Sequence, residues 1–250
     1  MHVAMTKPSA LGSLVLVALL AALPLARADD DEAAVRRSAL LGSIEAPANA
    51  IVKTWPGVRD RTLVGWTVAR SGPDGGSELV DLQIRLLQAS TGRVLARATL
   101  EKAWTSDAVA FTGFSLDTAD WAVEPARRAF GVRADFAHPG RLTIIDETRL
   151  WLFEVRGARI VPVLSNLLVD QRIESGQCGV YRERHATLAI APTRSHGHAD
   201  LALDVAAMDS TDSRVEPPAT CADEVRRRWR GLLRFDGVRY ASPVPEAGLD

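Results

Sequence analysis

Two histidines and an aspartate lie close together in residues 195–200, and their side chains are of the types that bind transition metals. On an extended chain, residues two apart point to the same side, so His196, His198 and Asp200 would line one face. Imidazole and carboxylate groups suit zinc, copper or nickel, and three ligands would leave one coordination position open. The serine and glycine of the same segment equally predict a solvated turn between two strands. We expect the turn, with a metal site as the alternative.

A second group of candidate residues is acidic and lies where an expected strand ends. Asp117, Asp120 and Glu124 surround Trp121 in the sequence. A glycoside hydrolase uses one carboxyl group as an acid and another as a nucleophile or base, and an exposed tryptophan would stack on the sugar. Aspartates are also favoured in turns, where their side chains accept hydrogen bonds from the backbone. The segment therefore predicts a turn, with glycan hydrolysis as the alternative.

The third group is a run of arginines near the C-terminus, in the segment RRRWRGLLR. Guanidinium groups in a row can bind carboxylate or phosphate groups of a glycan, a lipid headgroup or an acidic protein. A charged outer face that prevents edge-to-edge association of sheets is the simpler interpretation. In a strand, one face would be apolar and the other would carry four arginines: Arg226, Arg228, Arg230 and Arg234.

The chain has two cysteines, Cys178 and Cys221, and they do not form a C-x-x-C motif. In an oxidising compartment a lone pair of cysteines is most simply a disulfide, with a redox pair or two metal thiolates as the alternatives. A disulfide that closes a loop of this length would restrict the unfolded chain by about 4 kcal/mol.

Signatures of nucleophilic or phosphate chemistry are missing from the sequence. It contains no G-x-S-x-G, S-x-x-K or H-E-x-x-H motif and no glycine-rich phosphate loop. This lowers the expectation of an enzyme without excluding one, because catalytic triads assemble from distant residues. No cofactor is predicted.

The elements that must position these groups are expected to be β-strands. Apolar and polar residues alternate at period two in residues 62–70, 79–87 and 94–100, with turn-forming residues between them. Such half-buried alternation is typical of antiparallel sheets. Further strands are expected at residues 109–114, 128–136, 141–145, 149–155, 159–168, 179–190, 201–206 and 226–240.

About ten strands at short spacing predict an all-β fold, a single antiparallel β-sandwich or barrel-like domain with one disulfide. Pro162 indicates an edge strand or a β-bulge. Residues 118–128 are expected to form a loop with one helical turn. The β-rich domain would cover residues 51–250, after an N-terminal extension at 29–50 in which a short helix is expected at 33–41.

The first 28 residues have the three parts of an export signal: a short segment with Lys7, an apolar run, and the cleavage pattern Ala-Arg-Ala. Pro24 interrupts the run, which is also too short for a membrane-spanning helix. Removing residues 1–28 leaves 28 basic against 31 acidic residues, a balance too near neutral to predict a nucleic-acid partner. We expect a cleaved signal peptide, a periplasmic or secreted protein, and no transmembrane anchor in the mature chain.

The segments AFGVR, LWLF, VPVL and DGVRY together resemble exported β-rich proteins of proteobacteria, over about half of the mature chain. This resemblance implies the compartment and the fold class, and it implies no activity. The segment LLQASTGRVLARA is similar to the strand–turn–strand of quinoprotein-type propeller repeats. It occurs once, whereas a propeller repeats it at a fixed period.

Together these features predict an exported, non-enzymatic binding protein that acts through its surface on another exported or cell-envelope macromolecule. Inhibitors and immunity proteins are of this general kind. The alternatives are a small glycan-directed hydrolase at the acidic group and a periplasmic metal-binding protein at the histidine group.

Overall fold

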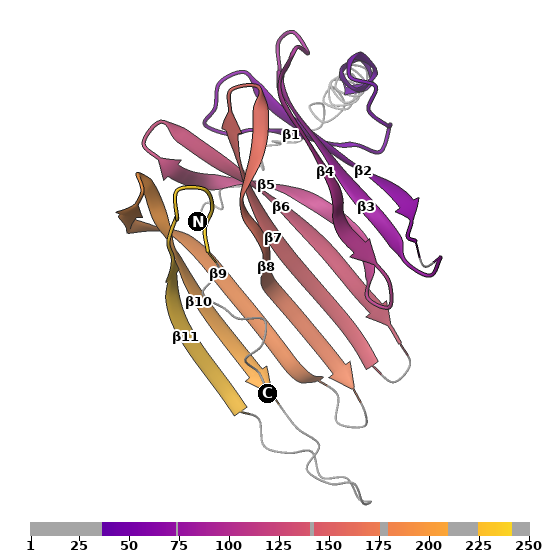
Figure 1. Cartoon of the computed structure of the whole chain (residues 1–250), viewed down its shortest axis with the longest axis vertical. Coiled ribbons are helices and arrows are strands. Elements are labelled where there is room, and N and C mark those ends of the chain that lie inside the picture. The colour runs from indigo at the N-terminus through magenta and orange to yellow at the C-terminus, as the bar shows by residue number, and fades with distance from the viewer. Residues whose placement is uncertain (1–36, 74, 141–142, 176–179, 210–224, 242–250) are drawn as a thin grey trace, which may run out of the picture.

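The computed structural model of the chain describes residues 37–73, 75–140, 143–175, 180–209 and 225–241. As the sequence predicts, the described chain is nearly all β, with one short helix at residues 37–43 and a sheet of eleven strands (Figure 1). The strands are β1 (Ile51–Thr54), β2 (Arg61–Ser71), β3 (Glu78–Gln88), β4 (Val94–Ser106), β5 (Ala110–Glu124), β6 (Arg127–Pro139), β7 (Thr143–Arg156), β8 (Arg159–Ser175), β9 (Val180–Ser195), β10 (His198–Asp209) and β11 (Val225–Leu233).

Two of the sequence predictions fall outside the described residues. These are the signal peptide at residues 1–28 and the disulfide between Cys178 and Cys221. Cleavage of the signal and formation of the disulfide therefore stay predictions. In the described part of the chain, no helix combines the length and the apolar character needed to cross a membrane.

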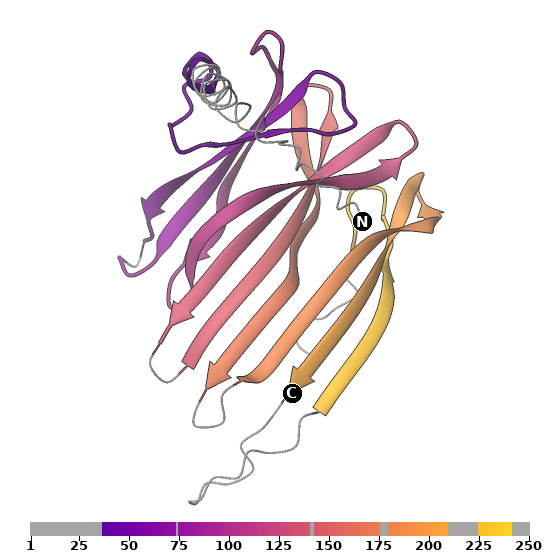
Figure 2. The same cartoon turned by 180° about the vertical axis from the view of Figure 1, so that it is seen from behind.

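Two antiparallel meanders meet at β8. Strands β5 to β11 pair in sequence order, and β1 to β4 do the same. A single parallel pairing, between Arg97 of β4 and Arg159 of β8, joins the two meanders. The expectation of a purely antiparallel sheet is wrong at this junction. Further along β8, from Asp170 onward, the neighbour is β9 instead of β4, so the sheet divides there. Figures 1 and 2 show β1–β4 and β9–β11 on opposite sides of the central strands.

The central strands are covered on both faces. Four consecutive residues of β7, Leu150, Trp151, Leu152 and Phe153, are all buried. The two leucines pack in an apolar cluster with β8, β9 and β10, whereas the two aromatic residues pack in a second cluster with β2, β3, β4 and β6. A strand that is buried on both faces carries apolar side chains on both, so apolar and polar residues do not alternate along it. This explains why the run LWLF is continuously apolar.

Two sequence expectations about the central strands are wrong. Residues 118–128 are two strand ends joined by a two-residue turn rather than a loop with a helical turn, because β5 continues to Glu124 and β6 begins at Arg127. Shifts of register after Asp117 and after Trp121 introduce bulges into β5, and these hide the alternation. The two strands expected at 141–145 and 149–155 are one strand, β7, over the described residues 143–156.

Three further features are the region around Pro162, the short helix and strand β1. The expected bulge at Pro162 is confirmed, since Val163 is an extra residue in the ladder between β7 and β8. The short helix packs Leu41 against Val64 and Leu87, on the outer face of β2 and β3. Strand β1 was not expected from the sequence.

Candidate functional site

The arginine run forms strand β11, and its pairing with β10 sets which face each side chain takes. Arg226, Arg228 and Arg230 lie at alternate positions, opposite Met208, Ala206 and Asp204 of β10, respectively. The intervening Trp229 and Leu233 pack in the apolar cluster on the other side of the sheet. Arg226, Arg228 and Arg230 therefore lie on the outer face of β9–β11. Arg234 follows the end of the strand.

One carboxylate of β10 holds two of these arginines. Arg228 donates from Nε to Asp204 Oδ1 at 2.8 Å and from Nη2 to Oδ2 at 2.7 Å. Arg230 donates from Nε to the same Oδ2 at 2.8 Å. The hydrogen bonds from Arg228 and then Arg230, with the charges of both, lower the pKa of Asp204 to about 2. The clamp of Asp204, Arg228 and Arg230 is thus fully ionised near neutral pH.

The clamp remains open to solvent. The side chains of Arg228 and Arg230 are 64% and 71% exposed. Arg230 uses only its Nε toward Asp204, and no further partner of its guanidinium group is found among the described residues. Two positive charges facing one negative charge leave a surplus of positive charge at this point of the surface. Guanidinium groups held in this way are suited to bind carboxylate or phosphate groups.

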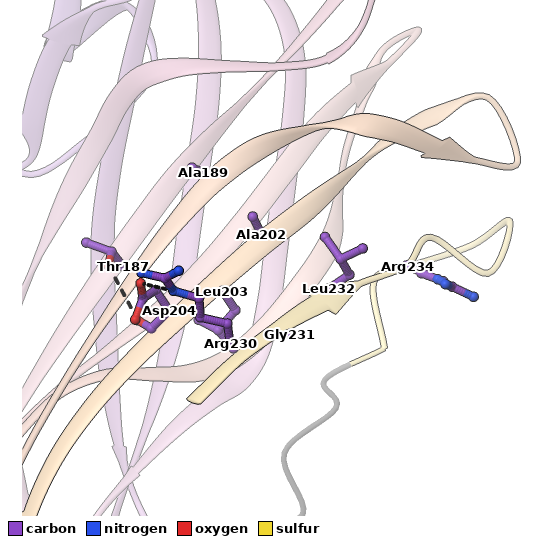
Figure 3. Close-up of a pocket in the computed structure, with 9 residues that line it drawn as sticks. All are labelled: Thr187, Ala189, Ala202, Leu203, Asp204, Arg230, Gly231, Leu232 and Arg234. Carbon is purple, nitrogen blue, oxygen red and sulfur yellow. Dashed lines mark hydrogen bonds and ion pairs between the residues drawn. The ribbon is translucent and has the colours of Figure 1, made fainter. Parts of the chain in front are cut away.

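A groove of about 690 Å³ runs beside the clamp across β9, β10 and β11 (Figure 3). Its apolar floor is a row of residues that pair across the three strands, Ala189, Ala202 and Leu232. Leu232 lies between Arg230 and Arg234, which both line the groove. The short side chains of Ala189 and Ala202 leave room above the sheet, and Leu232 is 41% exposed. The full lining comprises Thr187, Ala189, Ala202, Leu203, Asp204, Arg230, Gly231, Leu232 and Arg234.

The histidine group is divided between the turn and the interior. His198 is buried, and its Nε2 lies 2.6 Å from Glu154 Oε1 and 3.3 Å from Glu124 Oε1. Its ring stacks on Phe235 with 3.7 Å between the ring centroids. Glu154 is 1% exposed and also accepts from Arg156 at 3.0 Å. His198, Glu154 and Glu124 thus form a polar cluster at the beginning of β10.

His196 and Asp200 have other partners. His196 lies in the turn with φ of 50°, and its Nδ1 is 2.8 Å from the carbonyl oxygen of Phe235. Asp200 is buried and accepts a hydrogen bond from Thr193 at 2.7 Å. Hydrogen bonds from Ser195 and Thr193 lower the pKa of Asp200, and the charge of Arg234 adds to this effect. Among the residues that the structure describes, no three His, Cys, Asp or Glu side chains are grouped so as to hold a metal ion.

Each residue of the acidic group forms an ion pair with a different arginine. Asp117 pairs with Arg133 at 3.0 Å, and Asp120 pairs with Arg128 at 2.9 Å. Glu124 contacts Arg127 at 3.4 Å in addition to His198. The tryptophan among them, expected to be available to a sugar, is buried in the apolar cluster with β7 and β8. The structure therefore gives these carboxylates structural partners.

Sequence reasoning missed Glu154 and Asp204, although both were visible in the sequence. Glu154 is the one charged residue in the run LWLFEV, and a carboxylate in such a run must find a buried partner. Its partner is 44 residues away, which no local pattern specifies. Asp204 likewise depends on the register between β10 and β11. Comparisons with protein-family models, with curated proteins and with solved structures find no match to this chain.

Proposed function

We propose that this chain is a non-enzymatic binding protein of the periplasm or the extracellular space. On this proposal, the outer face of β9–β11 binds an acidic segment of another exported or cell-envelope protein. The observation that carries the proposal is the groove with an apolar floor beside the clamp, where two exposed arginines share a single carboxylate.

The composition of the groove favours a peptide over a small free anion. Charged groups line it, but its floor is formed by Ala189, Ala202 and Leu232. A phosphate ion would contact the guanidinium groups and leave this apolar floor exposed to water. A peptide segment with both carboxylate and aliphatic side chains would cover both parts, as is usual in protein interfaces.

The other candidate groups support a non-enzymatic role. The carboxylates of Asp117 and Asp120 are neutralised by Arg133 and Arg128. His198 is buried under Phe235. Groups with such partners serve the fold, whereas Arg230 retains donors that a partner can use.

A disulfide between Cys178 and Cys221 belongs to the same proposal. Both cysteines precede strands, β9 and β11, whose starts lie at one end of the sheet. Asp209 of β10 pairs there with Arg182 on one side and with Val225 on the other. This register places the starts of the two strands at the same end of the sheet, with β10 between them, and the disulfide itself stays a prediction.

The proposal is tested with residues 29–250 and two synthetic peptides, one alternating glutamate and valine and the other alternating glutamine and valine. We expect the glutamate peptide alone to bind, and to bind more weakly at high ionic strength. Replacing Arg228 and Arg230 by glutamine should weaken binding by about tenfold or more, because the charge-assisted hydrogen bonds are lost. Isothermal titration calorimetry gives the dissociation constants.

A matched control removes the same number of positive charges at another place in the chain. Arg59 and Arg93 are exposed and lie outside the strands, far along the chain from β11. Replacing both by glutamine should leave the dissociation constant unchanged. Equal weakening by the two double variants would show that net charge, and not this face, attracts the peptide, and the proposal would fail.

A further inference from the structure

Strand β11 lies at one end of the sheet. In the described part of the chain it pairs only with β10, over nine residues and without a shift of register. Among the described residues, the backbone N–H and C=O groups on its other edge from Arg227 to Leu233 have no strand partner. A straight edge strand of this length without proline is a template for a further strand.

The side chains of β11 restrict which strand can be added. Its sequence, VRRRWRGLL, contains four arginines and no acidic residue. A second copy of β11 would set arginine against arginine across the new ladder, which is unfavourable. A strand with acidic side chains would meet opposite charges instead. The edge therefore discriminates against a second copy of β11 and in favour of an acidic partner.

The spacing of the arginines sets the pattern of that partner. Arg228 and Arg230 lie two residues apart on the outer face, and Asp204 orients both. Directly opposed side chains on neighbouring strands lie about 5 Å apart, so carboxylates at alternate positions of an added strand would reach both guanidinium groups. Leu232 continues the same row toward the apolar floor of the groove.

The other ends of the sheet lack these properties. Strand β1 has only four residues, and its Lys53 donates to the carbonyl oxygen of Leu116 in β5. Strand β5 is bulged, and contacts from β1, β4, β9 and β10 reach it beyond its pairing with β6. Of the three terminal strands in the described part of the chain, only β11 is both long and regular, and all of its charged residues are basic.

We infer that the acidic segment binds as an added β-strand along the free edge of β11, with acidic residues at alternate positions facing Arg228 and Arg230. This inference rests on the proposed function and specifies the conformation and sequence pattern of the partner. Main-chain hydrogen bonds to β11 would supply affinity, and the arginines would select the sequence.

The test uses residues 29–250 and a nine-residue peptide that alternates glutamate and valine. Two derivatives carry N-methyl groups, one at the odd amides and the other at the even amides. In an added strand only alternate amides point toward β11. We expect one derivative to lose binding by about tenfold or more and the other to bind like the parent peptide, which also controls for the stiffening effect of N-methylation.

The outcomes separate this inference from the proposed function. If both derivatives bind like the parent, the arginine face binds acidic peptides without strand addition, and the inference is overturned. If neither the parent nor a derivative binds, the proposed function fails as well. Hydrogen exchange provides an independent measurement: the parent peptide should slow exchange at alternate amides of Val225–Leu233 and leave β1 unchanged.

Discussion

The two halves of strand β10 carry ionisable side chains in opposite surroundings. At its beginning, His198 is buried against Glu154 and stacked under Phe235. In its middle, Asp204 holds two arginines that are largely exposed. A buried pair that loses one partner leaves an uncompensated charge away from water, whereas an exposed pair exchanges its partners for water or for another molecule. The first cluster is therefore suited to stabilise the fold, and the second to bind a partner.

The largest effect on stability, and the sharpest test of this comparison, is expected from a change at Glu154. Its replacement by alanine should lower the free energy of unfolding by about 3–5 kcal/mol, because His198 and Arg156 would both lose their buried acceptor. The folded variant should bind the acidic peptide as the unmodified chain does. Urea unfolding measures the change in stability. Glu101, exposed on β4, is the control residue, and its replacement by alanine should cost less than about 0.5 kcal/mol.

A loss below about 1 kcal/mol on replacing Glu154 would contradict the comparison. It would mean that water or a rearranged side chain takes the place of the carboxylate at little cost. The buried and exposed clusters would then differ in their surroundings but not in their contribution to the fold.

A smaller effect on stability is expected from a change at Tyr240. The hydroxyl of Tyr240 donates a hydrogen bond to the carbonyl oxygen of Ala199 at 2.7 Å. Burial raises the pKa of Tyr240 above its ordinary value, and the nearby Glu154 and Asp200 add to this. Because the folded pKa is the higher one, the stability from this group is complete below pH of about 10 and declines as the pH rises above that value.

Replacing Tyr240 by phenylalanine tests this pH dependence. The variant should lose about 1 kcal/mol near neutral pH, since one hydrogen bond is removed. Its stability should then fall less steeply than that of the unmodified chain between pH of about 9 and about 11. Parallel alkaline slopes in urea unfolding would show that Tyr240 ionises as easily in the folded state as in the unfolded state.

The smallest effect on stability is expected at the exposed clamp of Asp204, Arg228 and Arg230. The arginines hold the pKa of Asp204 at about 2. Because this pKa is lowered, the contribution of the clamp is complete above the ordinary carboxyl pKa of about 4 and is lost as the pH falls through the folded value. Replacing Arg228 and Arg230 by glutamine should return the Asp204 titration, followed by carboxyl-carbon NMR, toward its ordinary value.

The complementary variant leaves the arginines in place and replaces Asp204 by asparagine. It should strengthen binding of the acidic peptide by roughly two- to fivefold, because the internal competitor for the guanidinium groups is removed. Weaker binding would show instead that Asp204 acts mainly by orienting the two arginines. Both results are compatible with an exposed cluster, but they assign different roles to its carboxylate.

The sequence predicts those parts of the fold in which one face of a strand meets water. Strand β3 alternates because one of its faces, with Val80, Leu82, Ile84 and Leu86, packs in the apolar cluster shared with β6 and β7, and β11 alternates because its arginines face solvent. In β2 the alternating face, with Val64 and Trp66, packs under the short helix instead. Prediction fails where this condition is absent. Strand β7 is buried on both faces, and the bulges of β5 break the alternation. The pairing of His198 with Glu154 connects distant residues, so it depends on the assembled sheet.

The single parallel pairing between β4 and β8 has a consequence for the order in which the molecule folds. Every other strand pairing joins neighbours in the sequence, so both meanders can form from local hairpins as the chain emerges, and local pairings form quickly. The β1–β4 meander, however, buries Leu82 and Ile84 in a cluster that also contains side chains of β5, β6 and β7, which are synthesised later. Until these strands arrive, the first half of the chain exposes a continuous apolar surface, and this interval is when aggregation or capture by a chaperone competes with folding.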